Sequence, residues 1–446
     1  MLLTTVLAVG MTPMPDVLVF SKTAGFRHGS IESGAEAIAT LAKGKWKLVL
    51  SEDSNVFKAR TLEQFEVVIF LNTTLDVLDE QQQAVFEAWL RGGGGWVGIH
   101  AAADTEYDWP FYGDMLGRAW FVGHPAVQEA TIVVEDLSHP AMGHLQPTWT
   151  RTDEWYDFAT SPRADVHVLA SLEETSYEGG SMGADHPIVW TVPIDDGVAF
   201  YTGLGHTTES WTEPAYLSHI AGAIDWASNH GWISLDQLDR DWANHVGWAE
   251  VSDIGFKDGS IVVVPETGVD GGDVFLSTGH GESRDLVSTA VFGDMELHLE
   301  FMVPAGGNSG VYVQGRYEIQ ILDSAGKTAL KAGDCGGVYQ RWDDARDPKG
   351  FEGTPPSVNA AKPAGQWQSY DIVFRAPTFD SEGNKLTNAR LDRVMHNGVL
   401  IHEDVELTGP TRGGSEPEIA QGPIRLQGDH GAIAYRNIRV RRLPAS

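Results

Sequence analysis

The spacing of apolar residues changes along this chain, and the change divides it into two parts. From Val17 to about Asn229, short apolar runs alternate with segments whose apolar residues recur at helical spacing. From about Trp232 onward, apolar and polar residues alternate in short runs that Gly, Asn and Asp separate. The first pattern predicts an α/β domain with a parallel, doubly wound sheet, and the second predicts an all-β, antiparallel sandwich. We therefore expect a leader of residues 1–15, one domain over residues 16–230 and another over residues 232–446.

Individual strands and helices follow from the same patterns. In the first half we expect strands over residues 17–20, 46–50, 67–71 and 96–99, and helices over residues 31–41, 74–90 and 215–227. In the second half we expect strands over residues 295–301, 310–314, 317–322, 370–375 and 424–427, with a hairpin turn at Asn397-Gly398. Ligands of doubly wound sheets bind beyond the carboxyl ends of the strands. The loops after residues 20 and 99 are therefore expected to lie at a site.

Residues 91–104 combine four glycines, a short apolar strand and a histidine. The strand ends on His100, which three alanines and Asp104 follow. This order is similar to a nucleophile elbow, a strand-to-helix turn that presents one reactive side chain. Because the elbow holds an imidazole instead of Ser or Cys, it favours proton transfer or metal ligation over acyl chemistry. A histidine that only caps the helix is the structural alternative.

Further histidines and acids stand at predicted strand ends and in loops of the first half. They are His28, His124, Asp153, Glu154, His186 and His206. Loops at one edge of an α/β sheet converge in space, so these residues predict a polar pocket. Their spacing matches no short metal motif such as His-Glu-x-x-His. No cofactor is therefore assigned, and a divalent metal ion stays an alternative.

The second half has polar side chains on one face of several predicted strands. By strand, the residues that share a face are His298 and Glu300, Glu318 and Gln320, and Arg425 and Gln427. The apolar face of such a strand packs in the core, so these side chains lie on a concave or outer surface. Together with His430 they could form a sugar site, or they could form an ordinary solvated face.

Several motifs of the first half resemble those of the trehalose-utilisation (ThuA-like) family. They are residues 17–20 with Gly25-Phe-Arg-His28, Gly98-Ile-His100 through Asp104 and Tyr107, Gly123-His-Pro125, Asp153-Glu-Trp-Tyr156, His186-Pro187 with Trp190, and Gly203-Leu-Gly-His206. The resemblance implies a glutamine-amidotransferase-like α/β fold and metabolism of 3-keto sugars. The missing Cys at the elbow disfavours an amidotransferase-like hydrolase.

For this first domain we hypothesise a step on a 3-keto sugar. His100 and His206 would transfer protons, and Asp104 or Glu154 would orient them. His28 and His124 would bind substrate.

Motifs of the second half look like those of the 3-keto-disaccharide hydrolase family. They are residues 292–301, Gly307-Asn-Ser-Gly310, Tyr317-Glu-Ile-Gln-Ile-Leu-Asp323, residues 362–367, Asn397-Gly398 and residues 422–431. The resemblance implies a concanavalin-like jelly roll that cleaves 3-keto-glycosides.

The chemistry of a keto sugar suggests roles for these residues. A ketone at C3 acidifies the proton at C2, so a base can remove it and expel the C1 substituent. We assign Glu318 or His430 as base or acid. The residues expected to bind the sugar or to shape its site are Glu300, Asn308, Gln320, Asp323, Arg425 and Gln427. Asp323 could instead be only a turn residue. The competing interpretation is a lectin-like module attached to a ThuA-like enzyme domain.

The composition of the chain limits the classes of molecule that it is expected to bind. The formal net charge of −31 disfavours nucleic acid and anionic membranes, so we expect a small-molecule or oligosaccharide substrate. No apolar run is long enough to span a membrane. The lone Cys335 excludes an intrachain disulfide and is expected to be buried rather than nucleophilic. Residues 1–10 are either part of a bacterial signal peptide or an unstructured leader, and the first interpretation predicts an extracytoplasmic protein.

Overall fold

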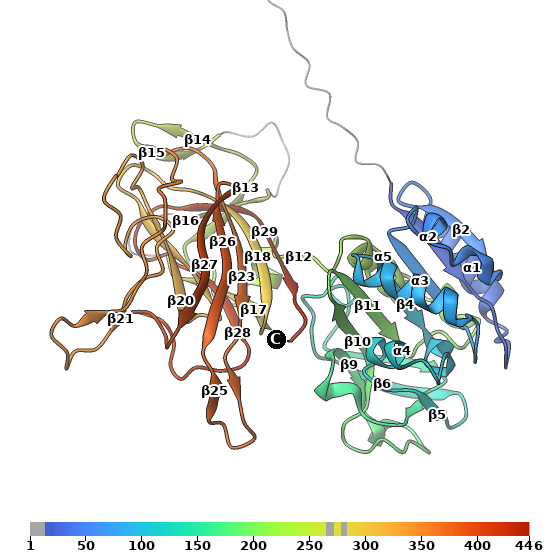
Figure 1. Ribbon diagram of the computed structural model, residues 1–446. Helices are drawn as coiled ribbons and strands as arrows, with labels where there is room; N and C mark the ends of the chain where they lie inside the picture. The colour runs from blue at the N-terminus through green and yellow to red at the C-terminus, as the bar shows by residue number, and fades with distance from the viewer. Residues whose placement is uncertain (1–13, 265–271, 278–282, 446) are drawn as a thin grey trace, which may run out of the picture. The chain divides into compact units, whose positions relative to one another are not determined.

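The computed structural model describes residues 14–264, 272–277 and 283–445. Nearly all of the expected leader thus lies outside the described residues. The chain divides into two compact units, residues 1–231 and 232–446, and each is described by itself (Figure 1). Among the described residues, no helix has both the length and the apolar character needed to cross a membrane.

The N-terminal unit is built on a nine-stranded mixed sheet. One half is parallel, in the order β2 (Lys47–Ser51), β1 (Asp16–Phe20), β3 (Val67–Leu71), β4 (Gly95–Ile99) and β11 (Gly197–Thr202). The other half consists of antiparallel strands, which follow β11 in the order β10 (Pro187–Ile194), β9 (His167–Leu172), β6 (Gln128–Val134) and β7 (Thr148–Asp153).

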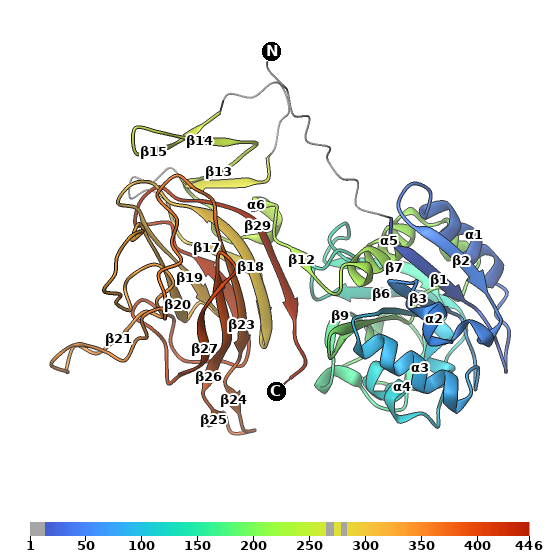
Figure 2. The same ribbon diagram turned by 45° about the horizontal axis from the view of Figure 1, so that its top comes forward.

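Helices cover both faces of this sheet. Figure 2 shows α1 (Ile31–Leu41) and α5 (Pro214–Ser228) on one side, and α3 (Glu80–Arg91) and α4 (Pro110–Met115) on the other. Ring contacts agree, because Phe70 of β3 packs on Phe86 of α3 while Phe200 of β11 packs on Trp226 of α5. The α/β class expected from the sequence is confirmed.

Two expectations for this unit are wrong. Strands and helices do not alternate as far as residue 229, because no α-helix interrupts residues 128–202, all of which the structure describes. Longer loops join β6 to β7 and β9 to β10, and a tight turn joins β10 to β11 at Asp195, whose φ is +51°. These strands are antiparallel, so the sheet is not parallel throughout, as the sequence pattern had predicted.

The helix expected from residue 74 begins only at Glu80. Leu75 has a φ of +56°, which is incompatible with a helix. Asp79 then caps α3 in a capping box with Gln82, and Glu80 lies in the first turn, so these two acids mark the true start of the helix.

The C-terminal unit contains two large antiparallel sheets and three two-stranded ones, β14 (Ile254–Lys257) with β15 (Ser260–Val263), β21 (Arg341–Trp342) with β22 (Gly350–Phe351), and β24 (Thr378–Phe379) with β25 (Lys385–Thr387). The larger has the order β13 (Trp248–Val251), β16 (Val274–Ser277), β29 (Ala434–Arg442), β18 (Met295–Met302), β23 (Gln368–Arg375), β26 (Ala389–His396) and β27 (Val399–Leu407), with β12 (Ile233–Ser234) also paired to β29. The smaller has the order β17 (Leu286–Phe292), β28 (Gly422–Leu426), β19 (Asn308–Val313) and β20 (Tyr317–Leu322).

The two sheets face each other across an apolar core. Tyr317 of β20 contacts Phe374 of β23 with ring centroids 5.5 Å apart. On β18, Leu297, Leu299 and Phe301 are fully buried while the residues between them point away from the core. The expected hairpin turn is present, because Asn397 and Gly398 both have positive φ between β26 and β27.

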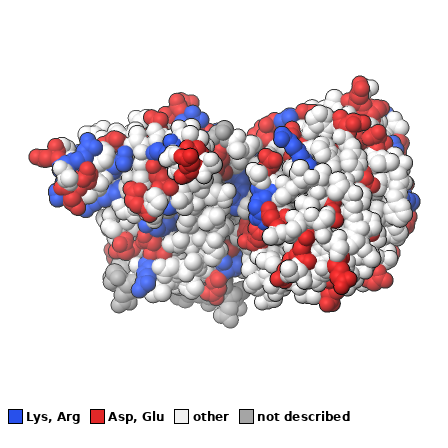
Figure 3. All heavy atoms as spheres, turned by 90° about the horizontal axis from the view of Figure 1, so that it is seen from below, with Lys and Arg blue, Asp and Glu red and all other residues white. Residues whose placement is uncertain are grey.

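Acidic side chains are dispersed over the surface. Figure 3 shows them scattered across the face in view, in keeping with the formal net charge of −31.

Candidate active sites

His100 stands at the end of β4, at a sharp turn into a short 3-10 helix (His100–Asp104). Its φ is +49°, a left-handed conformation that is rare for a residue with a side chain, and its side chain is fully buried. Nδ1 lies 2.9 Å from the Gly203 carbonyl, and the Tyr201 hydroxyl donates to the His100 carbonyl at 2.9 Å. The strand-to-helix turn expected from the sequence is therefore present, with a 3-10 turn in place of an α-helix.

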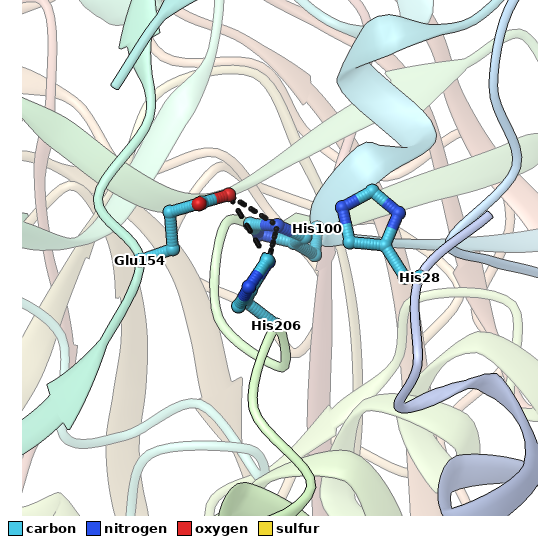
Figure 4. Close-up of side chains that lie close together, drawn as sticks. All are labelled: His28, His100, Glu154 and His206. Carbon is cyan, nitrogen blue, oxygen red and sulfur yellow. Dashed lines mark hydrogen bonds and ion pairs between the residues drawn. The ribbon is translucent and has the colours of Figure 1, made fainter. Parts of the chain in front are cut away.

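Four residues from four loops meet at this turn. Each of His28, His100, Glu154 and His206 offers a nitrogen or oxygen atom, and these atoms all lie within 4.8 Å of one another. Glu154 Oε2 lies 3.3 Å from His100 Nε2 and 3.0 Å from His206 Nδ1, and the two nitrogens are 3.2 Å apart. Figure 4 shows His28 on the far side of His100 from Glu154, with one ring nitrogen pointing toward the others.

Asp153, next to Glu154, fixes the loop that carries His206. Its buried carboxylate accepts hydrogen bonds from the backbone N–H groups of Gly205 at 2.8 Å and His206 at 3.1 Å. Arg151, also buried, pairs with the same carboxylate at 2.6 Å. This arrangement holds two loops together and leaves the side chains of the four-residue group free of Asp153 and Arg151.

Charge within the group is paired. Burial alone would raise the pKa of the Glu154 carboxyl, but hydrogen bonds from His100 and His206 outweigh it and hold that pKa well below its usual range. Burial lowers the pKa of His206, but the hydrogen bond and charge of Glu154 produce a net rise. Burial, then the neighbouring His100 and His206, lower the pKa of His28 to about 3, so its ring is neutral.

The other predicted residues of this domain lie around the group. His124 is exposed and its Nδ1 lies 3.1 Å from Glu154 Oε1. Asp104 accepts a hydrogen bond from the Tyr107 hydroxyl at 2.6 Å, and burial raises its pKa. His186 lies apart, in a group with Asp157 and Glu174. Both of its ring nitrogens have partners, so its position favours a structural role.

The C-terminal unit has a second polar group, on the face of the smaller sheet that points away from the core. Strand register places Tyr312 between Glu318 and Arg425 in one row. Glu318 is only 3% exposed, and burial raises its pKa to about 7 although Tyr312 and Arg425 act in the opposite direction. The Arg425 guanidinium lies 3.8 Å from the Tyr312 ring centroid and 3.5 Å from an oxygen of Asp285.

Most of the predicted sugar-binding residues lie near this row. Gln320 and Asn308 are on the same sheet face, because they alternate with core residues of β20 and β19. Gln427 continues the face of Arg425, and its backbone N–H donates to the Gly310 carbonyl. His430 is exposed, bonded to Asp429, and close enough for its charge to affect Glu318.

Two predicted residues fall outside this group. Glu300 lies on the larger sheet, on the face away from the core, where it pairs with Arg436 at 2.6 Å. The core lies between it and Glu318, so the expectation that both acids line one site is wrong. Asp323 accepts a hydrogen bond from the Gly306 N–H at 2.9 Å, which matches the alternative that it is a turn residue.

The sequence did not identify Tyr312 or Asp285 as residues of a site. Asp153 was named there as part of a motif, but no role was given to it. For Tyr312, only the register of β19 on β20 reveals the contact with Glu318. Cys335 is buried as expected, burial raises its pKa to about 11, and its Sγ contacts the Tyr370 hydroxyl. A thiol so held is a poor nucleophile.

Comparisons with known proteins agree with this division of the chain. Residues 16–227 match the family model described as "Trehalose utilisation" (ThuA), and residues 231–441 match that of the "3-keto-alpha-glucoside-1,2-lyase-like domain". A comparison with curated proteins gave no match.

Solved structures resemble either half of the chain. One is named as a ThuA-like protein from Bacteroides uniformis, with 26% identity over 50% of this chain and 95% of that chain, at a TM-score of 0.43. Another is named as a glycosyl hydrolase from Parabacteroides distasonis, with 29% identity over 46% of this chain and 84% of that chain, at a TM-score of 0.33.

Proposed function

Because the chain joins a ThuA domain (residues 16–227) to a 3-keto-alpha-glucoside-1,2-lyase-like domain (residues 231–441), we propose that it is a carbohydrate-active enzyme with one reaction site in each domain. The C-terminal site cleaves 3-keto-glycosides by elimination. The N-terminal site acts on the same sugar or on the product.

The buried carboxyl of Glu318, with its raised pKa, is the main support for the proposal on the C-terminal site. A general base is most effective when its pKa is near the working pH, and burial raises the pKa of Glu318 to about 7. Tyr312 lies beside this carboxylate and Arg425 lies beyond Tyr312 in the same row, so a hydroxyl and a positive charge are available to stabilise an enolate oxygen. An ordinary glycosidase instead needs two opposed carboxylates; the second predicted acid, Glu300, lies on the other sheet, and Asp285 of the same group pairs with Arg425.

The proposed reaction has two stages. In the first, Glu318 takes the proton from C2, the electrons form the C1=C2 bond, and the C1–O bond breaks while His430 protonates the departing oxygen. Arg425 stabilises the enolate that develops at the C3 oxygen. In the second, water adds a hydroxyl to C1 and a proton to C2, so the net result is hydrolysis.

The N-terminal site supports acid–base or metal-assisted chemistry on a 3-keto sugar. His100 and His206 flank Glu154 within hydrogen-bonding distance, which suits proton transfer as well as ligation. His124 and Asp104 stand at the edge of the group and are our candidates for contacts with the sugar.

Substrate specificity tests the elimination. We expect the full chain to convert a 3-keto-glucoside and to leave the unoxidised glucoside intact, because only the ketone acidifies C2. With deuterium at C2, the product should lose the label to solvent. Equal turnover of the unoxidised glucoside with the label retained would contradict elimination, and binding of both sugars without any product would support the lectin-like alternative. Chromatography and mass spectrometry of the products distinguish these outcomes.

The pH dependence of the C-terminal reaction tests the role of Glu318. A base must be ionised, and the pKa of Glu318 is raised to about 7, so kcat/KM should increase as the pH rises through about 7 and then level off. In an Arg425→Gln variant the midpoint should move to higher pH, because a positive charge that favours the carboxylate is lost. A rate that falls over the same range would make Glu318 the acid and not the base.

A further inference from the structure

We propose that His28, His100, Glu154 and His206 bind one divalent transition-metal ion, and that the ion binds the ketone oxygen of the 3-keto sugar. The ion is inferred from the geometry alone, whereas its sugar ligand rests on the proposed function.

The distances match a metal coordination sphere. A tetrahedral ion with bonds of about 2.0–2.1 Å places neighbouring ligand atoms about 3.3 Å apart. The three distances among Glu154 Oε2, His100 Nε2 and His206 Nδ1 are 3.0, 3.2 and 3.3 Å, which describes one face of such a polyhedron. A ring nitrogen of His28 lies within 4.8 Å of these atoms and adds a fourth donor, so the ketone oxygen would be the fifth ligand of the ion.

His28 is the residue that hydrogen bonding leaves unexplained. Its side chain is 4% exposed, yet its ring makes no hydrogen bond among the described residues, and it meets His100 and His206 only edge to face. A buried polar group without a partner destabilises a fold, so such groups call for a specific explanation. The buried His28 atom without a partner is Nδ1, whereas Figure 4 shows the other ring nitrogen, the one not bonded to Cγ, directed at the group. An ion in the group would be the partner of that second nitrogen and would hold the ring in place.

Outer contacts prepare the donors for an ion. The Gly203 carbonyl can only accept a hydrogen bond, so His100 carries a proton on Nδ1. An ion would displace the Nε2 proton that His100 shares with Glu154, and the Nε2 lone pair would then face the group. His124 contacts Oε1 of Glu154 and leaves Oε2 facing the other two donors. Asp153 holds the backbone of His206, as described above.

The donor set selects the class of ion. Three imidazoles and one carboxylate suit zinc and similar transition metals, whereas Mg²⁺ and Ca²⁺ prefer oxygen ligands. His206 and His124 are partly exposed, so the open side of the group faces solvent there. An ion at this place would polarise a ketone oxygen as a Lewis acid, which is the function that a keto-sugar enzyme requires.

Metal analysis of the full chain tests the ion independently of turnover. Protein stripped with a chelator is incubated separately with Zn²⁺, Co²⁺ or Mg²⁺ and exchanged into buffer. We expect one equivalent of Zn²⁺ or Co²⁺ per chain, no Mg²⁺, and a rise in the melting temperature on addition of Zn²⁺. His28→Ala and His206→Ala should each weaken Zn²⁺ binding by about 100-fold or more. His230→Ala removes an exposed histidine elsewhere in the same unit and should bind like the wild type.

Two outcomes would overturn the proposal. In the first, wild-type protein with an intact circular dichroism spectrum binds neither Zn²⁺ nor Co²⁺. In the second, the His28→Ala and His206→Ala variants bind Zn²⁺ as tightly as the wild type does. The ring of His28 makes no hydrogen bond among the described residues, so its variant should fold, and circular dichroism checks this. A 3-keto sugar should alter the visible spectrum of bound Co²⁺, and an unchanged spectrum would reject the sugar ligand. A chain that binds the ion but converts no 3-keto sugar would contradict the proposed function alone.

Discussion

Replacing Glu318 by Gln is expected to lower the rate of 3-keto-glycoside cleavage by about 10²–10⁴-fold, the usual contribution of a general base. Glutamine keeps the size of the side chain, so the packing beside Tyr312 should survive. Because burial disfavours the ionised form of Glu318, we expect the variant to be at least as stable as the wild type at alkaline pH. Release of the aglycone from a 3-keto-glucoside by the full chain measures the effect.

Glu300→Gln is the matched control for this experiment. Glu300 is also an acid on a polar strand face, but it lies on the larger sheet and pairs with Arg436. Its variant should keep nearly the full rate. Full activity of Glu318→Gln, or equal losses in the two variants, would reject Glu318 as the base.

Replacing Asp153 by Ala is expected to destabilise the N-terminal domain by about 3–5 kcal/mol, as when one partner of a buried ion pair is removed. Arg151 would keep its charge in the interior and would retain its ion pair with Glu213. The backbone N–H groups of Gly205 and His206 would also lose their acceptor. Hydrogen exchange of the backbone amides of the N-terminal domain, followed in increasing urea, measures the free energy of unfolding of this domain separately from that of the other.

Glu87→Ala provides the comparison. Glu87 pairs with Arg91 one turn away on the surface of α3, and such exposed pairs contribute about 0–1 kcal/mol. If the two variants lost equal stability, the buried pair would not have the structural role that we assign to it.

The sequence predicted the elements of the first domain well where apolar runs were long. The strands ending at residues 20, 71 and 99 are within one residue of those observed, since fully buried strands leave a continuous apolar signal. Convergence of His28, His100 and His206 could also be anticipated, because all three follow strands of the parallel half. Glu154 was expected there too, although it follows β7 in the antiparallel half.

The sequence could not reveal contacts that depend on strand register. A period of two says that Glu300 and Glu318 each lie on a polar face, but not that these faces belong to opposite sides of a sandwich. The proximity of Tyr312 to Glu318 depends on the pairing of β19 with β20, which no local pattern encodes. The absence of a partner for His28 is likewise visible only in three dimensions.

The pairing of β12 with β29 bears on how the two domains came to share one chain. Ile233 lies opposite Val440 and Ser234 opposite Arg439, so the chain enters and leaves the C-terminal unit at adjacent places in one sheet. Domains with neighbouring ends can be joined to or inserted into other sequences with little distortion. Such a unit is well suited to recombination as a gene segment, and residues 232–234 belong with it in any shortened version, because they supply a strand of its sheet.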